Sequence, residues 1–229
     1  LADYLIEKKI VKKFYEPYPC SVETLKRAHS EKYIYNIKNK TLDKNEVKKI
    51  GFPLVDSVVQ RSLIATGGTV LASKLAINNG VACNTAGGSH HANYDGGAGF
   101  CVFNDVAVAS QYLLDKGLAG KILIVDLDVH QGDGTASIFS DHKNVFTFSM
   151  HCDSNFPLKK MISDIDVPLN KGVEDNEYLD TLGLNLDRLK EIPSDIIFFH
   201  VSFSFFLISL YANSDRLFFF DFLSDFEAP

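Results

Sequence analysis

Apolar runs that alternate with helix-like segments constrain the fold of this chain more than any other feature of its sequence. The runs lie at 122–125 (ILIV), 145–150 (VFTFSM) and 196–199 (IIFF), and the helix-like segments at 57–78, 105–116 and 177–190. Unbroken apolar runs of this length are typical of strands that are buried on both faces. Their alternation with helices favours a parallel sheet covered by helices on both sides. We therefore predict a three-layer αβα fold, in which a mostly parallel sheet lies between two layers of helices.

Several residues mark where these elements should begin and end. Asn104 or Asp105 is a suitable N-cap for the helix at 105–116, and Gly117 is a suitable stop. Gly80 should end the helix at 57–78, and residues 81–83 are a candidate strand. The sequence shows no internal repeat and no linker-like tract, so we expect one domain over residues 1–229.

Charge and cysteine content exclude some classes of protein. The net charge is −6, and no basic patch appears beyond short runs such as residues 8–13, which argues against direct nucleic-acid binding. The acidity suits a basic peptide substrate and equally suits ordinary solubility. The four cysteines lack CxxC spacing, so we expect buried free thiols in a reducing compartment, either cytoplasmic or nuclear. The N-terminus lacks the features of a secretory signal, and we predict no membrane span.

The segment after the first apolar run carries metal-binding residue types. Asp126, Asp128 and His130 alternate along the chain, and alternate side chains of an extended segment point to the same side. Ligands bind at the carboxyl ends of strands in open α/β sheets, and a carboxylate with an imidazole suits zinc or a related metal. The alternative is structural, because carboxylates after a strand often cap the next helix.

A second segment contains the adjacent histidines His90 and His91 in a glycine-dense loop. Adjacent histidines are often only structural. Here Asp126 and Asp133 could each orient one imidazole, which is the arrangement of an acid–base pair.

At this point the chain resembles a known family. GGSHHANYDGGAGFCVFNDVAVA (87–109) and ILIVDLDVHQGDGT (122–135) are similar to the two signature blocks of the arginase/deacetylase fold in its histone deacetylase branch. Further matching blocks extend the resemblance over about residues 25–200, and it is greatest to class IV deacetylases and their bacterial relatives. The resemblance implies a hydrolase that removes acetyl or longer acyl groups from lysine side chains.

The resemblance also implies roles for individual residues. It makes Asp128 and His130 zinc ligands, His91 the general base, and His90 its partner imidazole. Asp126 and Asp133 would orient His90 and His91, respectively. Gly99 would contact the substrate through its backbone, and Phe100 and Phe156 would form the aromatic walls of the acyl-lysine channel. Ser149 and Met150 match a structural monovalent-cation site, together with Asp126, Asp128 and His130 of the DLDVH segment (126–130). The alternative for Ser149 and Met150 is a plain strand end.

The match fails towards the C-terminus. Ser204 stands where the family has its third zinc ligand, an aspartate, and the tyrosine expected to bind the oxyanion has no counterpart. Residues 201–229 hold eight of the 18 phenylalanines, and no glycine follows Gly183. We therefore expect a C-terminally truncated fold in which this atypical tail is an altered reading frame, a retained intron or a truncated product.

These observations leave several functions open. The first is an active zinc deacetylase acting on acyl-lysine in proteins such as histones. The second is an inactive remnant or binding protein of the same fold, and the third is an amidohydrolase for a small molecule of the acetylpolyamine type. A two-manganese arginase-like hydrolase fits less well, because the histidine pair and the aromatic walls suit a single metal.

Overall fold

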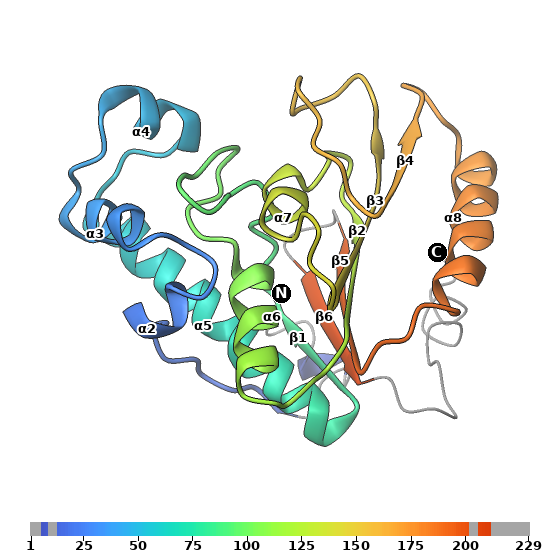
Figure 1. Ribbon diagram of the computed structural model, residues 1–229, viewed down its shortest axis with the longest axis horizontal. Coiled ribbons are helices and arrows are strands. Elements are labelled where there is room, and N and C mark those ends of the chain that lie inside the picture. The colour runs from blue at the N-terminus through green and yellow to red at the C-terminus, as the bar shows by residue number, and fades with distance from the viewer. Residues whose placement is uncertain (1–5, 9–12, 202–205, 212–229) are drawn as a thin grey trace.

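The computed structural model describes residues 6–8, 13–201 and 206–211, and a six-stranded sheet lies at its centre (Figure 1). The strands are β1 (Val81–Asn84), β2 (Ile122–Leu127), β3 (Val145–Cys152), β4 (Ile165–Leu169), β5 (Ile196–Val201) and β6 (Phe206–Tyr211). Their order across the sheet is β1-β6-β5-β2-β3-β4. Strands β5, β2, β3 and β4 are parallel, whereas β6 is antiparallel to both β5 and β1. The predicted mostly parallel α/β fold is confirmed.

Helices cover both faces of this sheet. They are α2 (Val22–Leu25), α3 (Glu31–Asn39), α4 (Lys44–Ile50), α5 (Asp56–Asn79), α6 (Asp105–Asp115), α7 (Asp133–Ile138) and α8 (Asp175–Leu189). Helix α8 lies on one side of the sheet, and the other helices lie on the opposite side (Figure 1). The predicted helix ends are confirmed where caps were expected. The Asn104 side chain accepts a hydrogen bond from the Ala107 N–H, and Gly80 is the C-cap of α5.

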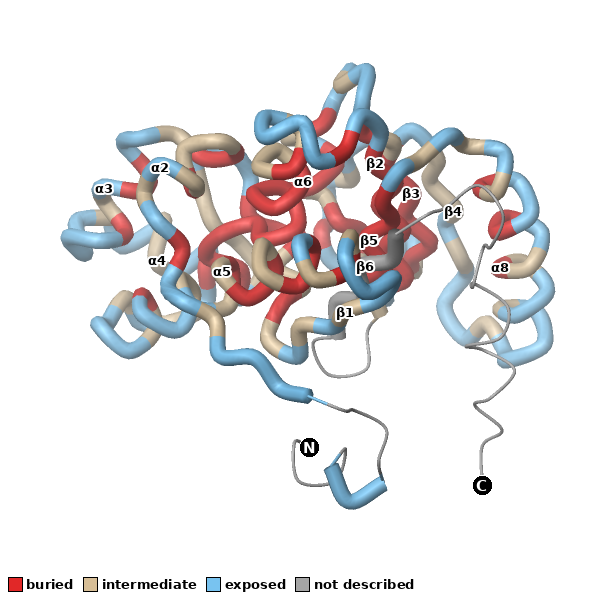
Figure 2. Tube along the Cα trace, turned by 90° about the horizontal axis from the view of Figure 1, so that it is seen from below, coloured by how far each residue is buried: buried red, intermediate tan, exposed pale blue. Residues whose placement is uncertain are grey.

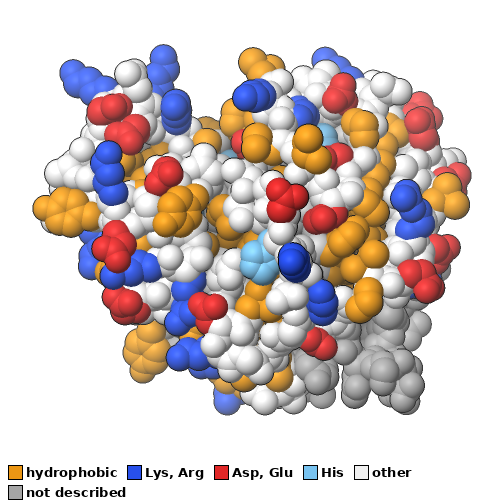
Figure 3. Space-filling view, in the orientation of Figure 1, with side chains coloured by type: hydrophobic (Ala, Val, Ile, Leu, Met, Phe, Trp, Pro, Cys, Tyr) orange, Lys and Arg blue, Asp and Glu red, His pale blue; other side chains and the backbone are white. Residues whose placement is uncertain are grey.

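Two apolar cores form because successive residues of a buried strand face opposite sides of the sheet. On β2, Ile122 and Ile124 join the core that includes α5 and α6, whereas Leu123 and Val125 join the core under α8. The buried residues concentrate in the central strands and in α5 and α6 (Figure 2). Hydrophobic side chains are also visible at the surface over β4 and α8 (Figure 3). This alternation places Asp126, which follows Val125, on the same side as α5 and α6.

Some elements were not predicted. Strand β4 is only partly buried and contains Pro168, so its sequence lacks a continuous apolar run. The antiparallel β6 lies within the apolar stretch that we had assigned to an atypical tail. Helix α7 is short and contains Gly134, a poor helix former.

The cysteine prediction is partly wrong. Cys20 and Cys101 are buried free thiols, but Cys83 is exposed on β1 and Cys152 is only partly buried. Cys83 lies on β1, at one edge of the sheet, and Cys152 is the last residue of β3.

Among the described residues, no helix has the length and apolar character needed to cross a membrane. Ser204 and residues 212–229, on which the third-ligand and tail predictions rest, lie outside the described residues.

Candidate active site

A buried imidazole–carboxylate pair lies at the carboxyl end of β2. Nδ1 of His90 is 2.6 Å from Oδ2 of Asp126, and both side chains are almost fully buried. Burial alone would raise the pKa of Asp126, but the charges of His90 and His200 outweigh it and lower the pKa. Asp126 is therefore ionised, and it fixes the ring of His90 by accepting a hydrogen bond from Nδ1–H.

His91 is held in the same way by a different carboxylate. Its Nδ1 is 2.6 Å from Oδ1 of Asp133, the first residue of α7. Burial lowers the pKa of His91, and this effect outweighs the opposing influence of Asp133. Nε2 of His91 is therefore available as a base near neutral pH, and it lies 3.1 Å from Nε2 of His90.

The glycine-dense loop is anchored just before the histidine pair. The buried carboxylate of Asp105 accepts hydrogen bonds from the backbone N–H groups of Gly88 (3.1 Å) and Ser89 (2.7 Å). Thr69 on α5 donates a further hydrogen bond to the same carboxylate. The side chain of Asn104 donates to the carbonyl of Ala92 at 3.1 Å, on the other side of the pair. Both flanks of the histidine pair are thus tied to the start of α6.

The DLDVH segment brings two candidate metal ligands together, although not in the predicted way. We expected an extended chain from Asp126 to His130, but β2 ends at Leu127. The carboxylate of Asp126 accepts the Asp128 N–H at 3.0 Å, and that of Asp128 accepts the His130 N–H at 2.8 Å. These side-chain-to-backbone bonds bend the chain because they compete with strand pairing. Oδ1 of Asp128 and Nδ1 of His130 end 2.9 Å apart, close enough to bind one cation.

His200 is a component of the site that the sequence analysis did not predict. It lies on β5 directly opposite Asp126 in the parallel register, and its Nδ1 is 3.1 Å from Oδ1 of Asp126. The direction of the N–H does not suit a hydrogen bond, so this is an electrostatic contact. Burial lowers the pKa of His200, but the charge of Asp126 outweighs it and the pKa rises to about 8.

His90, Asp126 and His200 thus form a buried group whose ligand atoms all lie within 4.8 Å of one another. Asp126 contacts one imidazole through each carboxylate oxygen. We interpret this group as a carboxylate that is shared by two imidazoles, because these pairings occupy its ligand atoms.

The aromatic residue Phe156 forms one wall beside the histidines. Its ring centroid is 4.8 Å from that of His91 and 6.3 Å from that of His130. Gly99 has a positive φ of 53° and lies between His91 and Phe156, where a Cβ atom would be only 2.9 Å from the Phe156 ring. Only glycine fits there without displacing one of the two rings.

Phe100 follows Gly99 in the chain and is 65% exposed. Its own φ is 65°, a left-handed conformation that is uncommon outside glycine. Its backbone N–H donates to the carbonyl of Ile50 at 2.7 Å, and its ring contacts that of Phe52 with 5.1 Å between centroids. Exposed aromatic surface at this position suits contact with a substrate.

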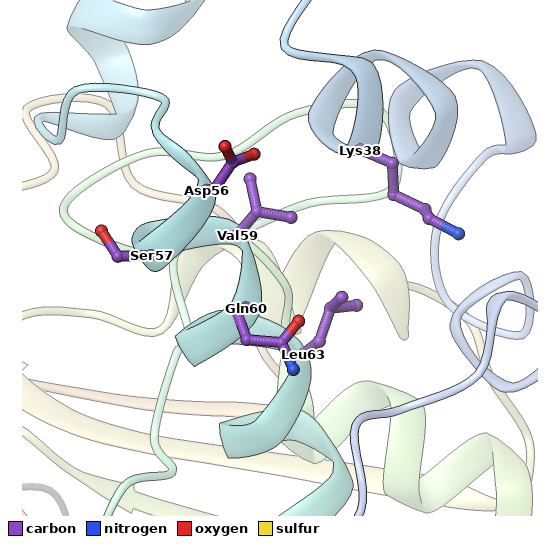
Figure 4. A pocket seen from close by; sticks show the side chains of 6 residues that line it. All are labelled: Lys38, Asp56, Ser57, Val59, Gln60 and Leu63. Atoms are coloured by element: carbon purple, nitrogen blue, oxygen red, sulfur yellow. The ribbon is translucent and has the colours of Figure 1, made fainter.

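A separate surface hollow lies between α3 and the start of α5 (Figure 4). Its lining includes Asp56, whose carboxylate pairs with Lys40. It contains no histidine or cysteine and none of the predicted site residues. The histidine pair is therefore the candidate active site.

This arrangement of paired imidazoles, orienting carboxylates and adjacent metal-binding side chains on a parallel α/β sheet is accompanied by similarity to known proteins. The family model of the histone deacetylase domain matches residues 1–198. The chain therefore belongs to the histone deacetylase family.

Individual relatives agree with this assignment. The chain is 47% identical over 186 residues to an uncharacterized protein of Picosynechococcus sp., covering 81% of this chain and 62% of that protein. It is 31% identical over 201 residues to Histone deacetylase 2 of Arabidopsis thaliana, covering 83% of this chain and 50% of that protein. It thus spans about half to two thirds of the length of these relatives.

A solved structure shows the same fold. The crystal structure of a histone deacetylase homolog from Aquifex aeolicus superposes with a TM-score of 0.75 at 29% sequence identity. The match covers 86% of this chain and 60% of that one.

Proposed function

We propose that this chain is the catalytic core of a zinc-dependent deacetylase that hydrolyses the amide of acetyl- or acyl-lysine in proteins. The observation that carries the proposal is the facing pair His90–His91, in which each ring has its own carboxylate partner. Membership of the histone deacetylase family agrees with it.

The geometry of the pair suits acid–base catalysis. Both Nδ1 atoms face carboxylate oxygens, so each carries a proton and donates it. The two Nε2 atoms are 3.1 Å apart, so both face the same point, and a proton taken up by one ring can be passed on by the other. One ring would act as the base and the other as the acid. We assign the base to His91, because burial lowers its pKa and because it is the ring next to Phe156 and Gly99.

Asp128 and His130 fit two of the ligands of a zinc ion. Their ligand atoms converge, their side chains are partly exposed towards the site, and one oxygen with one nitrogen suits zinc. When bound, zinc would supply Lewis-acid chemistry towards the amide carbonyl and the attacking water. Ser149 and Met150 remain predictions for a monovalent cation; the Ser149 hydroxyl lies 3.0 Å from Nδ1 of His151.

In the reaction, His91 would remove a proton from the attacking water, and the pair would return a proton to the leaving lysine amine. Asp133 and Asp126 would hold the two rings in the required tautomers. The products would be acetate and the free lysine side chain. Phe156 and Phe100 would contact the apolar stem of the substrate, which enters more readily as neutral acyl-lysine than as charged lysine.

An acetyl-lysine peptide assay with added zinc tests this proposal. We expect hydrolysis by the wild type and a loss on the order of 100- to 10,000-fold in His91→Ala, the range that acid–base catalysis contributes. His142→Ala is a matched control, because this partly buried imidazole packs on Phe139 with 5.6 Å between ring centroids and lies outside the site. Equal rates for wild type and His91→Ala would contradict the proposal. An acetylpolyamine offered in parallel separates a protein substrate from a small molecule.

A further inference from the structure

The loop between β3 and β4, residues 153–164, carries Phe156, and a buried side-chain amide binds its backbone. Apolar side chains project from it into solvent: Leu158 is 94% exposed and Ile162 is 85% exposed. Apart from the buried Pro157 and from Phe156, which packs on His91 and His130, the apolar side chains of the loop are exposed. Its order therefore depends on polar contacts near its two ends.

Asp164 at the end of the loop is hydrogen-bonded to Thr147 on β3, and a second contact is made by Gln131, the residue that follows His130. Its side chain is 1% exposed, and both ends of its amide are used. Nε2 donates to the carbonyl of Met161 at 2.7 Å, and Oε1 accepts the Met161 N–H at 2.8 Å. A side-chain amide thus pairs with the loop backbone in the way that a neighbouring strand would.

Asp166 on β4 completes this arrangement. Its Oδ1 accepts from Nε2 of Gln131 at 2.8 Å, and its Oδ2 accepts the Ser163 N–H at 2.8 Å. We name Gln131 and Asp166 together the loop clamp. Because each polar atom of the Gln131 side chain has a partner, the clamp fixes the loop relative to the DLDVH segment.

The other end of the loop is braced from within. Nζ of Lys160 donates to the carbonyls of Asn155 (2.7 Å) and Pro157 (2.6 Å), which flank Phe156. Lys160 directly precedes Met161, so the brace around Phe156 is continuous with the backbone held by Gln131. Movement at Met161 would therefore reach Phe156.

We propose that Gln131 is a positioning residue that holds the Phe156 ring in its place beside the rings of His91 and His130. This proposal rests on the proposed function for its consequence, which is the width of the slot for the acyl-lysine stem. Gln131 contacts no reacting atom; it acts through the loop. A purely structural glutamine would affect folding stability without changing where Phe156 lies.

The position of Phe156 can be measured without any activity. The rings of Phe156 and His91 are 4.8 Å apart between centroids, within reach of NMR cross-relaxation between ring protons. In Gln131→Ala we expect that signal to be lost, and the Met161 and Ser163 amides to exchange about 5- to 10-fold faster, the effect of one lost hydrogen bond. Met161→Ala is the matched control, because the clamp uses only the Met161 backbone.

A reversed pair tests the clamp more specifically. Gln131→Glu would place two carboxylates in contact and should open the loop. Adding Asp166→Asn restores a hydrogen bond between positions 131 and 166 in the opposite direction, with the same total charge. We expect the double variant to recover part of the ring-to-ring signal that Gln131→Glu loses.

Kinetics then test the consequence. On an acetyl-lysine peptide we expect Gln131→Ala to lose roughly 10- to 100-fold in kcat/KM, with KM rising more than kcat falls, because a displaced wall misplaces the substrate. An unchanged ring-to-ring signal, or a changed signal with unchanged KM in an active enzyme, overturns the proposal. An inert wild type that shows the NMR differences overturns the proposed function and leaves the clamp supported.

Discussion

His29 provides a prediction whose magnitude follows from the structure. This imidazole is fully buried, its Nδ1 lies 2.8 Å from the carbonyl of Asn93, and its Nε2 accepts the Asn104 N–H at 2.9 Å. Nδ1 must therefore carry the only ring proton. A second proton on Nε2 would face the Asn104 N–H, so the native state cannot bind it favourably.

Burial lowers the pKa of His29 from 6.5 to about 4. A pKa difference of one corresponds to about 1.4 kcal/mol, so protonation of His29 should destabilise the fold by about 3 kcal/mol in total. The sign is fixed because the unfolded chain binds a proton that the native chain does not. Stability is full above pH 6.5, falls as the pH drops below that value, and stops falling near pH 4. This loss is a large part of a typical folding free energy of about 5–15 kcal/mol.

Urea denaturation across this pH range measures the effect. We expect His29→Gln to be less stable than the wild type near pH 7 but to lose less stability on acidification. Its free energy of unfolding should lack a slope of about 1.4 kcal/mol per pH unit between pH 4 and 6.5. Groups such as His91, whose pKa is also lowered, remain in both proteins and cancel in the comparison. Parallel curves for the two proteins would refute the reasoning.

Three further predictions concern the candidate active site. His200→Ala should lower the free energy of unfolding by about 3–5 kcal/mol, measured by denaturation near pH 7, because it leaves Asp126 with one fewer cationic partner inside the protein; a change below about 1 kcal/mol would contradict this pairing. Asp128→Ala should weaken zinc binding in a calorimetric titration, whereas Asp56→Ala, on the surface between α3 and α5, should not. Asp133→Asn should lower kcat on an acetyl-lysine peptide by about 100-fold or more, since it replaces the carboxylate that sets the His91 tautomer with a neutral amide that can also donate; retained activity would show that the Asp133 carboxylate does not orient His91.

The central architecture could be predicted from sequence because it depends on local apolar patterns. The runs that became β2, β3 and β5 are buried on both faces, so each reads as continuous hydrophobic sequence. The weaker elements could not be predicted in this way. Strand β4 pairs only with β3 and is partly exposed, and α7 depends on tertiary contacts such as the Thr135 N–H bonded to the carbonyl of His90.

In the candidate active site, too, the residues in local motifs could be predicted and the residue placed by strand pairing could not. Short motifs identified the two histidines and the two carboxylates, the family resemblance implied the pairs His90–Asp126 and His91–Asp133, and the structure brings both pairs within hydrogen-bonding distance. Their catalytic roles stay predictions. His200 was missed because its contact with Asp126 arises from the register of β5 against β2, which no local motif encodes.

The central claim is that the histidine pair hydrolyses an acyl-lysine amide with water. The most direct test is to incubate the zinc-supplemented chain with an acetyl-lysine peptide in isotopically labelled water and to analyse the acetate by mass spectrometry. We predict acetate that carries one labelled oxygen, released by the wild type and at least about 100-fold more slowly by His91→Ala. No labelled acetate from a folded wild-type chain that binds zinc would contradict it.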